Sequence, residues 1–378
     1  MAGDALGGAA PVASVAPAMT AARHGGDVEG ARRTWGRERW LDFSSNICPL
    51  GVPRPVADAL TEHLSDDLTS YPDPQCRRVR EIVGRLCGAS EDEVLPGCGV
   101  SQLLWALGPL LPSPVLLPEP SFVDYRRSLA RRGGHDVRPF HLKLESPGPS
   151  PDDLAEGAAG CRAILMGNPN NPTSFLFQPN ELVSALTPWL DGGGLLVLDE
   201  SFVTLTDGGA ANSCWPLLRG RPNVVVFQSV TKSLALPGLR LGWVLGGKEL
   251  LAKLADELPD WSVSGPATRA AEAFGRLDEY AASRRKWLIE QRKYLTDGLS
   301  NLPGVTVFPP SANFVLVRFE RTTGTFVAQK LAERGILVRR CADFPGLDDR
   351  YVRLAVKDGT ANRQLLAALE ETLKEGER

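Results

Sequence analysis

Residues 193–200 read Gly-Gly-Leu-Leu-Val-Leu-Asp-Glu, a short apolar run that begins after glycines and ends in an acid. Other short apolar runs recur along the chain, and helical patterns separate several of them. The predicted strands are Val94–Pro96, Pro114–Leu117, Ala163–Met166, Leu195–Leu198, Val224–Phe227 and Trp243–Leu245, and the predicted helices are Val100–Leu110, Phe122–Arg132 and Asn180–Leu190. This alternation favours an α/β fold with a mostly parallel central sheet flanked by helices. Ligands of such sheets bind beyond the carboxyl ends of the strands.

The C-terminal part of the chain predicts a second, smaller α+β unit. Ala267–Leu299 reads as a long helical region, broken near Gly275, that bridges two domains. The elements expected after it are strands at Val305–Phe308, Phe314–Phe319, Ile336–Arg339 and Tyr351–Val356 and helices at Thr325–Glu333 and from about Ala361. The predicted division is a flexible extension (1–22), an N-terminal arm packing with the small domain (23–60), a large domain (61–275) and a small C-terminal domain (276–378).

Composition excludes several classes of protein. The 378 residues carry 42 Lys+Arg and 45 Asp+Glu, a net charge of −3, so the charge balance lacks the basic footprint of a nucleic-acid-binding protein. No run approaches the roughly 18 apolar residues of a membrane span. The seven Cys are scattered without a Cys-x-x-Cys pair, and the four His lack ligand spacing. We expect a reduced, cytoplasmic protein with no metal site and no nucleic-acid or membrane partner.

Four segments contain residue types that can take part in catalysis or bind a ligand. Asp199 closes an apolar strand, and Lys232 follows another strand in a turn with Ser229, Thr231 and, eight residues on, Arg240. The other two segments are the turn Gly167-Asn-Pro-Asn-Asn-Pro-Thr173 and the glycine-containing turn Pro96-Gly-Cys-Gly-Val-Ser-Gln102. The last of these can present backbone N–H groups to an anion, but it lacks the third glycine of a dinucleotide fingerprint. Taken singly, each segment also fits an ordinary loop, cap or turn.

Together the four segments fit pyridoxal 5′-phosphate as cofactor. This cofactor needs a lysine for an imine, a carboxylate at its pyridine nitrogen, a partner for its 3′-oxygen and a cradle for its phosphate. Ser229-Val-Thr-Lys232 also matches the Ser-x-x-Lys of penicillin-binding enzymes. That family requires Ser-Asp-Asn and Lys-Thr-Gly as well, and neither tripeptide occurs here.

Motifs from about His24 to the C-terminus resemble those of fold-type I pyridoxal-phosphate enzymes, the aminotransferase class I/II superfamily. The chain looks most like the L-threonine-O-3-phosphate decarboxylases of cobalamin biosynthesis, and next like the histidinol-phosphate aminotransferases. The matching segments are His24-Gly-Gly, Leu41-Asp-Phe-Ser-Ser-Asn-Ile-Cys-Pro-Leu-Gly51, Tyr71-Pro-Asp-Pro, Asn168-Pro-Asn-Asn-Pro-Thr173, Asp199-Glu-Ser-Phe, Thr231-Lys-Ser-Leu-Ala-Leu-Pro-Gly-Leu-Arg-Leu-Gly242 and Asp343-Phe-Pro-Gly-Leu-Asp-Asp-Arg-Tyr-Val-Arg-Leu-Ala-Val356.

The resemblance implies a role for each matching position. Lys232 would carry the imine and Asp199 would pair with the pyridine nitrogen. The other implied cofactor contacts are Asn171 at the 3′-oxygen, Phe122 stacked on the ring, and Val100, Ser101, Ser229, Thr231 and Arg240 at the phosphate. Tyr71 would reach the cofactor phosphate of a second subunit, which implies a homodimer with active sites at the interface. The implied substrate contacts are Arg353 at the carboxylate and Arg339, with His24 and Asn46, at a distal anion.

Departures from the decarboxylase-like pattern leave the substrate and reaction open. Asp27, Cys48 and Cys98 stand where that group usually has Asn, and Arg340 stands where an acid is common. The expected function is a pyridoxal-phosphate enzyme acting on an α-amino acid with a second polar or anionic group, first as a threonine-phosphate-decarboxylase-like lyase. The alternatives are a histidinol-phosphate-type aminotransferase and a specialised enzyme of secondary metabolism that catalyses elimination, replacement or C–C bond formation. A binding protein without turnover would be expected to lack the lysine or the acid, or to carry a DNA-binding domain.

Overall fold

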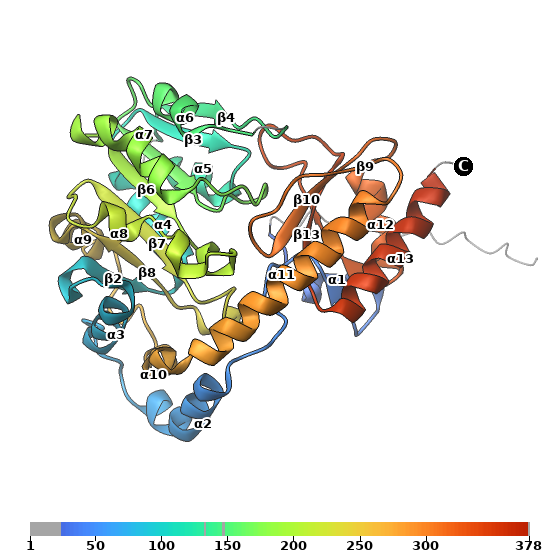
Figure 1. Cartoon of the computed structure of the whole chain (residues 1–378). Helices are drawn as coiled ribbons and strands as arrows, with labels where there is room; N and C mark the ends of the chain where they lie inside the picture. The colour runs from blue at the N-terminus through green and yellow to red at the C-terminus, as the bar shows by residue number, and fades with distance from the viewer. Residues whose placement is uncertain (1–23, 132–133, 146–147, 377–378) are drawn as a thin grey trace, which may run out of the picture.

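The chain folds around three sheets, of seven, four and two strands. The structure is a computed structural model and describes residues 24–131, 134–145 and 148–376. Figure 1 shows the seven-stranded sheet with its helices on one side and the four-stranded sheet with the C-terminal helices on the other. The expected flexible extension, residues 1–22, lies outside the described residues.

The seven-stranded sheet is mostly parallel, as the sequence predicts. Its order is β2-β8-β7-β6-β5-β3-β4, and only β8 runs antiparallel to its neighbours. The strands are β2 (Val94–Gly97), β3 (Val115–Glu119), β4 (Val137–His141), β5 (Ala163–Gly167), β6 (Leu195–Asp199), β7 (Val224–Ser229) and β8 (Gly242–Gly246). The sequence did not predict β4. This edge strand is partly exposed and contains Pro139, so it lacks the apolar run of the buried strands.

Helices cover both faces of this sheet, because alternate side chains of each strand point to opposite faces. Val197 belongs to one apolar cluster, while Leu196 and Leu198 on either side of it belong to the other. The first cluster includes residues of α4 (Gly99–Leu107), α5 (Val123–Leu129) and α9 (Lys248–Ala255). The second includes residues of α3 (Arg77–Cys87), α6 (Pro151–Gly157), α7 (Pro179–Asp191), α8 (Trp215–Leu218) and α10 (Gly265–Glu272). The predicted mixed α/β architecture is confirmed.

The C-terminal unit has its own core. Its antiparallel sheet has the order β12-β13-β10-β9, formed by β9 (Val305–Val307), β10 (Phe314–Phe319), β12 (Arg339–Arg340) and β13 (Tyr351–Ala355). Three helices pack on it, namely α11 (Asp278–Ser300), α12 (Gly324–Glu333) and α13 (Gly359–Gly376). Short 3₁₀ segments occur at Glu91–Glu93, Gly108–Leu110, Val203–Leu205, Gly209–Asn212, Pro237–Leu239 and Phe274–Arg276.

The N-terminal arm contacts both units. After α1 (Val28–Trp35), β1 (Leu41–Asp42) pairs in parallel with β11 (Ile336–Leu337) of the C-terminal unit. The end of the arm differs from the expectation that residues up to 60 pack with that unit. Helix α2 (Arg54–Thr69) packs on α10, so its Val56 and Ala59 lie in an apolar cluster of the large sheet. The domain boundaries stated above stay predictions. Among the described residues, no helix is long and apolar enough to cross a membrane.

Candidate active site

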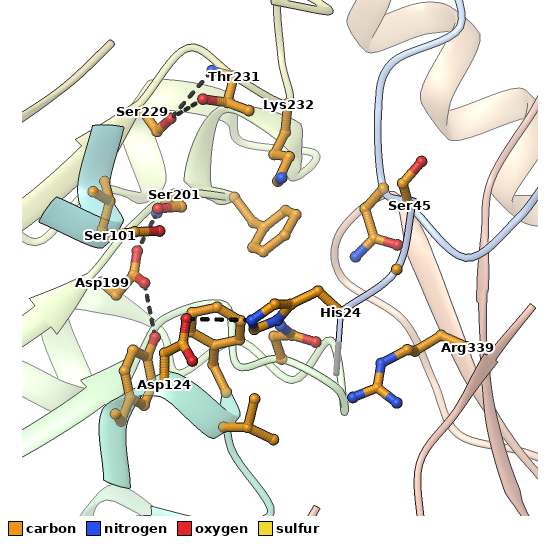
Figure 2. A pocket seen from close by; sticks show the side chains of 18 of the residues that line it. His24, Ser45, Ser101, Asp124, Asp199, Ser201, Ser229, Thr231, Lys232 and Arg339 are labelled. Atoms are coloured by element: carbon orange, nitrogen blue, oxygen red, sulfur yellow. Dashed lines mark hydrogen bonds and ion pairs between the residues drawn. The ribbon is translucent and has the colours of Figure 1, made fainter. Parts of the chain in front are cut away.

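One cavity collects all but one of the site residues singled out from the sequence. It lies at the carboxyl ends of β5, β6 and β7, where the C-terminal unit and the N-terminal arm close over the large sheet (Figure 2). The singled-out residues that line it are His24, Asn46, Val100, Ser101, Phe122, Asn171, Asp199, Ser229, Thr231, Lys232, Arg240, Arg339 and Arg353. The exception is Tyr71, which is 84% exposed in the single chain and places its ring 5.0 Å from that of Trp261.

Lys232 enters the cavity from the turn after β7. Ser229 Oγ accepts a hydrogen bond from the Thr231 amide at 3.1 Å and donates one to Thr231 Oγ1 at 2.9 Å, which orders the start of this turn. Burial, together with the positive charges of Arg353 and Arg240, lowers the pKa of Lys232 to about 8, while Asp199 opposes this shift. A substantial fraction of the amine is therefore neutral, and nucleophilic, near neutral pH.

Asp199 is held in one orientation at the end of β6. Tyr125 Oη donates to its Oδ2 at 2.8 Å, and the backbone N–H of Ser201 donates to its Oδ1 at 2.9 Å. Burial raises the pKa of Asp199, and the hydrogen bonds from Ser201 and Tyr125 act in the opposite direction. Burial and the adjacent carboxylate raise the pKa of Tyr125 well above its usual range, so its hydroxyl stays a donor. The carboxylate is thus a fixed partner for a cationic N–H in the cavity.

The first turn of α4 and Arg240 form a cradle for an anion. Val100 and Ser101 begin this helix behind Gly99, and the hydroxyls of Ser229 and Thr231 line the same cavity. Gly99 has a φ of +74°, and a Cβ at this position would lie 2.6 Å from Arg240 Nη2. The absence of a side chain therefore lets the guanidinium approach the helix start. Backbone N–H groups at a helix N-terminus with an adjacent arginine suit a phosphate.

The three asparagine side chains of the turn at residues 167–173 make different contacts. Asn168 bonds both backbone groups of Phe177, donating to the carbonyl at 3.1 Å and accepting from the amide at 2.9 Å. Asn170 donates to the carbonyl of Pro120 at 2.9 Å. Asn171 lines the cavity, where its Oδ1 accepts from Arg353 Nη1 at 2.5 Å. The first two amides hold the turn, and the third is the one available to a ligand.

Arg353 and Asn46 line the cavity, and each has one buried polar atom without a partner in the described part of the chain. Arg353 is buried and donates through Nη2 to the carbonyl of Ser44 at 2.7 Å. Its Nε and the Oδ1 of Asn46 have no hydrogen-bond partner among the described residues. Buried polar atoms in folded proteins are normally paired, so these two are exceptions beside the cavity.

Two acids that the sequence interpretation did not single out sit beside the distal cations. Arg339 Nη2 lies 2.7 Å from Asp343 Oδ2, and its guanidinium lies 4.9 Å from the centre of the Phe344 ring. His24 Nε2 lies 3.6 Å from Asp124 Oδ2, a buried carboxylate (Figure 2). A distal anion of a substrate that approached Arg339 and His24 would therefore meet these carboxylates as well.

Tyr125 and Ser201 were also missed by sequence reasoning. Their spacing from residues that were singled out could have identified them. Ser201 follows Asp199 by two residues, the spacing at which an aspartate accepts from a backbone amide, and Tyr125 follows Phe122 by three residues on a predicted helix. Only the fold brings Tyr125 to Asp199, since 74 residues separate them.

Comparisons with known proteins agree with this geometry. The profile of the family described as "Aminotransferase class I and II" matches residues 38–369. Threonine-phosphate decarboxylase of Salmonella typhimurium is 31% identical over 356 residues, which cover 93% of this chain and 96% of that protein. The histidinol-phosphate aminotransferase structure from Clostridium acetobutylicum covers 89% of this chain and 99% of its own, with 28% identity and a TM-score of 0.82. That of Sinorhizobium meliloti, in complex with pyridoxal-5′-phosphate, covers 92% of this chain and 94% of its own at 21% identity, and its TM-score of 0.80 shows a shared fold.

Proposed function

The chain belongs to the class I and II aminotransferase family, whose enzymes use pyridoxal phosphate, and on this premise we propose that it decarboxylates an α-amino acid carrying a phosphate or another second anionic group. One observation carries the proposal. The amine of Lys232 and the carboxylate of Asp199 line the same cavity, and an anion cradle stands at its α4 end. This arrangement supports a lyase like threonine-phosphate decarboxylase, a relative that is 31% identical over 93% of this chain.

The residues of the cavity fit the cofactor at each of its polar groups. Lys232 would bind the aldehyde, and Asp199 would accept from the protonated ring nitrogen. Asn171 is the proposed partner of the 3′-oxygen and Phe122 the stacking residue. The phosphate would be held by the residues of the cradle, namely Val100, Ser101, Ser229, Thr231 and Arg240. The cradle supports this fit, because a side chain at Gly99 would occupy the space beside Arg240.

The chain's own residues would orient the substrate and move its protons. When bound, the cofactor supplies an electron sink for the bond broken at the α-carbon. Arg353 and Asn46 would bind the α-carboxylate. The neutral amine of Lys232 can accept a proton from the α-carbon or return one to it. The carboxylate of Asp199 would keep the ring nitrogen protonated, so that the ring can accept the electrons released at the α-carbon.

The distal end of the cavity would recognise the second anionic group. Arg339 and His24 are the proposed contacts. Since Asp343 and Asp124 already approach these cations, a monoanion would gain little there, whereas a phosphate dianion would compete better for them. This charge balance supports a phosphorylated substrate over a simple amino acid.

Transamination of a histidinol-phosphate-type substrate is the second candidate. The observation that favours it is the buried amine of Lys232, whose lowered pKa leaves part of it neutral and able to transfer a proton at the α-carbon in either reaction. Incubation with L-threonine phosphate should yield carbon dioxide and aminopropanol phosphate. Formation of a keto product from histidinol phosphate with an α-keto acid would instead favour the transaminase. If neither product forms, both candidate functions are contradicted.

The lysine assignment has its own test. Lys232→Ala should abolish the visible absorbance that a lysine-bound cofactor gives and the borohydride-dependent labelling of the chain. Lys293→Ala is the matched control, since Lys293 is exposed on α11 and pairs with Asp297. A Lys232→Ala protein that is still yellow and still labelled by borohydride would refute the assignment.

We also propose a homodimer, as the resemblance implies. Large apolar side chains are exposed on α2 and nearby, namely Leu64, Leu68, Tyr71 and Trp261. A second copy covering them would remove this surface from water. Leu68→Arg should lower the mass measured by light scattering toward that of a monomer. Leu217→Arg, at another exposed leucine on α8, should leave the mass unchanged, and a monomeric wild type would refute the proposal.

A further inference from the structure

The turn that carries Lys232 is held by its own hydrogen bonds, such as those from the amides of Leu234 and Leu236 to the carbonyls of Val230 and Thr231, and by contacts from other segments. Between β7 and the 3₁₀ segment at 237–239 the chain has no regular helix or strand. The carbonyl of Lys232 accepts from the amide of Cys48 in the N-terminal arm at 3.0 Å. The carbonyl of Ser233 accepts from Arg284 Nη1 at 3.2 Å and from Tyr280 Oη at 3.4 Å, both on α11. The peptide that bears the lysine is thus fixed by the arm and by one helix.

Arg284 also binds the segment that follows Asp199. Its Nη2 donates to the carbonyl of Thr204 at 3.2 Å, and Thr204 lies in the 3₁₀ segment 203–205 that begins four residues after Asp199. One rigid guanidinium therefore joins the loop behind the lysine to the loop behind the acid. Its planar fork sets the distance between the two carbonyls, which a flexible single-point donor would not do.

Packing alone gives no reason for a guanidinium at this position. Arg284 is only 8% exposed, and among the described residues it makes no ion pair, only hydrogen bonds to carbonyls and a ring contact with Tyr280 at 5.8 Å. Burial lowers its pKa, the direction expected for a cation taken out of water. An apolar side chain would fill the space without that cost.

Helix α11 connects these loops to the C-terminal unit. Its Leu288, Leu295 and Leu299 lie in the core of that unit, and Figure 1 shows the helix running from the large sheet's side of the molecule to the C-terminal sheet. The helix is therefore a rigid support to which both loops are attached.

We propose that Arg284 is a positioning residue that fixes the Lys232 turn against the loop after Asp199, so that amine and carboxylate face the cavity at the right separation. The inference rests on the proposed roles of Lys232 and Asp199. Arg284 touches neither the cavity nor those two side chains, and it acts through the carbonyls of Ser233 and Thr204.

The helix offers a matched control for a test on the holoenzyme. Arg292 lies eight residues further along α11, is also 8% exposed, and also donates to a carbonyl, that of Ser311 at 2.8 Å, besides contacting Asp207. Arg284→Met and Arg292→Met would be compared by amide hydrogen exchange of the segments 230–236 and 200–206. The pH midpoint of the lysine-dependent absorbance and the separate kcat and KM values would be measured on the same samples.

Arg284→Met should raise exchange in both segments, shift the absorbance midpoint and lower kcat by about 10- to 100-fold with little change in KM, because a misplacement of about 1 Å costs on the order of 100-fold. Arg292→Met should lower the unfolding temperature but leave these readouts unchanged. If the two variants behave alike, Arg284 is merely structural and the proposal is overturned.

Two milder variants keep the proposal testable if Arg284→Met does not fold. Arg284→Lys keeps the charge but reaches only one carbonyl. Tyr280→Phe keeps Arg284 and removes the Tyr280 hydroxyl, which contacts the carbonyl of Ser233 and, at 2.9 Å, that of Gly51 in the N-terminal arm. Both should shift the absorbance midpoint relative to the wild type, and unshifted midpoints in both would overturn the proposal. A failed Lys232→Ala test would refute the proposed function, whereas hydrogen exchange in the two segments would still decide whether Arg284 holds them.

Discussion

The free amine of Lys232 should be far more reactive in the apoenzyme than an ordinary lysine. Burial, Arg353 and Arg240 lower its pKa from 10.5 to about 8. At pH 7.5 the neutral fraction then rises from about one in a thousand to about a quarter, a gain on the order of 200-fold. Since only the neutral amine attacks an aldehyde, the rate of cofactor binding should follow this fraction.

The assay is the pH dependence of covalent labelling. Apoenzyme would be treated briefly with pyridoxal phosphate and borohydride between pH 6 and 11, and the modified fraction of the peptide containing Lys232 would be measured by mass spectrometry. The labelling should reach half its maximum near pH 8. Low concentrations of reagent keep the other lysines largely unmodified and available for comparison in the same digest.

Substitutions of the charged residues near Lys232 should move the pH midpoint of labelling in opposite directions. Arg353→Met removes a positive charge and should move the midpoint upward, whereas Asp199→Asn removes a negative charge and should move it downward. A wild-type midpoint above pH 10, or shifts of the opposite sign in these variants, would refute the electrostatic account of the cavity.

Three further outcomes are expected. Tyr125→Phe removes the hydrogen bond to Asp199, so the pKa of that carboxyl should rise further and kcat should fall about tenfold, checked by steady-state kinetics at several pH values. Gly99→Ala places a Cβ 2.6 Å from Arg240 Nη2 at a positive φ, so affinity for pyridoxal phosphate should fall at least about tenfold in a titration of apoenzyme. The unfolding free energy of the apoenzyme should include a contribution that increases between pH 8 and 10.5, because unfolded Lys232 still holds a proton that the folded amine has lost, and Lys232→Met should remove that contribution in denaturant titrations.

Much of the fold could be predicted because its elements are strongly patterned. The strands of the large sheet other than β4 were located within a few residues from their apolar runs, and Phe314–Phe319 matches β10 at both ends. The helical region after residue 265 breaks near Gly275, as predicted, into α10, a 3₁₀ turn and α11. The edge strand β4 and the packing of α2 were not predicted, because neither has a local apolar signature that identifies its partner.

The candidate site was predictable where motifs are short and local. Lys232 with Ser229, Thr231 and Arg240 lies within one stretch of chain, and the resemblance extended this to residues such as Arg353. Asp124 beside His24 carried no such signal, because 100 residues separate the two in sequence. Asp343 lies only four residues after Arg339, but its contact with that guanidinium was not singled out.

By itself, the sequence determined the alternation of strands and helices and the residue types that reach the carboxyl edge of the sheet, since periodicity and strand ends are local properties. Only the tertiary structure decided that Tyr125 donates to Asp199 and that Arg284 ties the lysine turn to the loop after the acid. It also decided that His24 lies beside the carboxylate of Asp124. These contacts join residues from different elements, and the free energy that selects them comes from burial and charge in the folded chain rather than from any neighbouring residue.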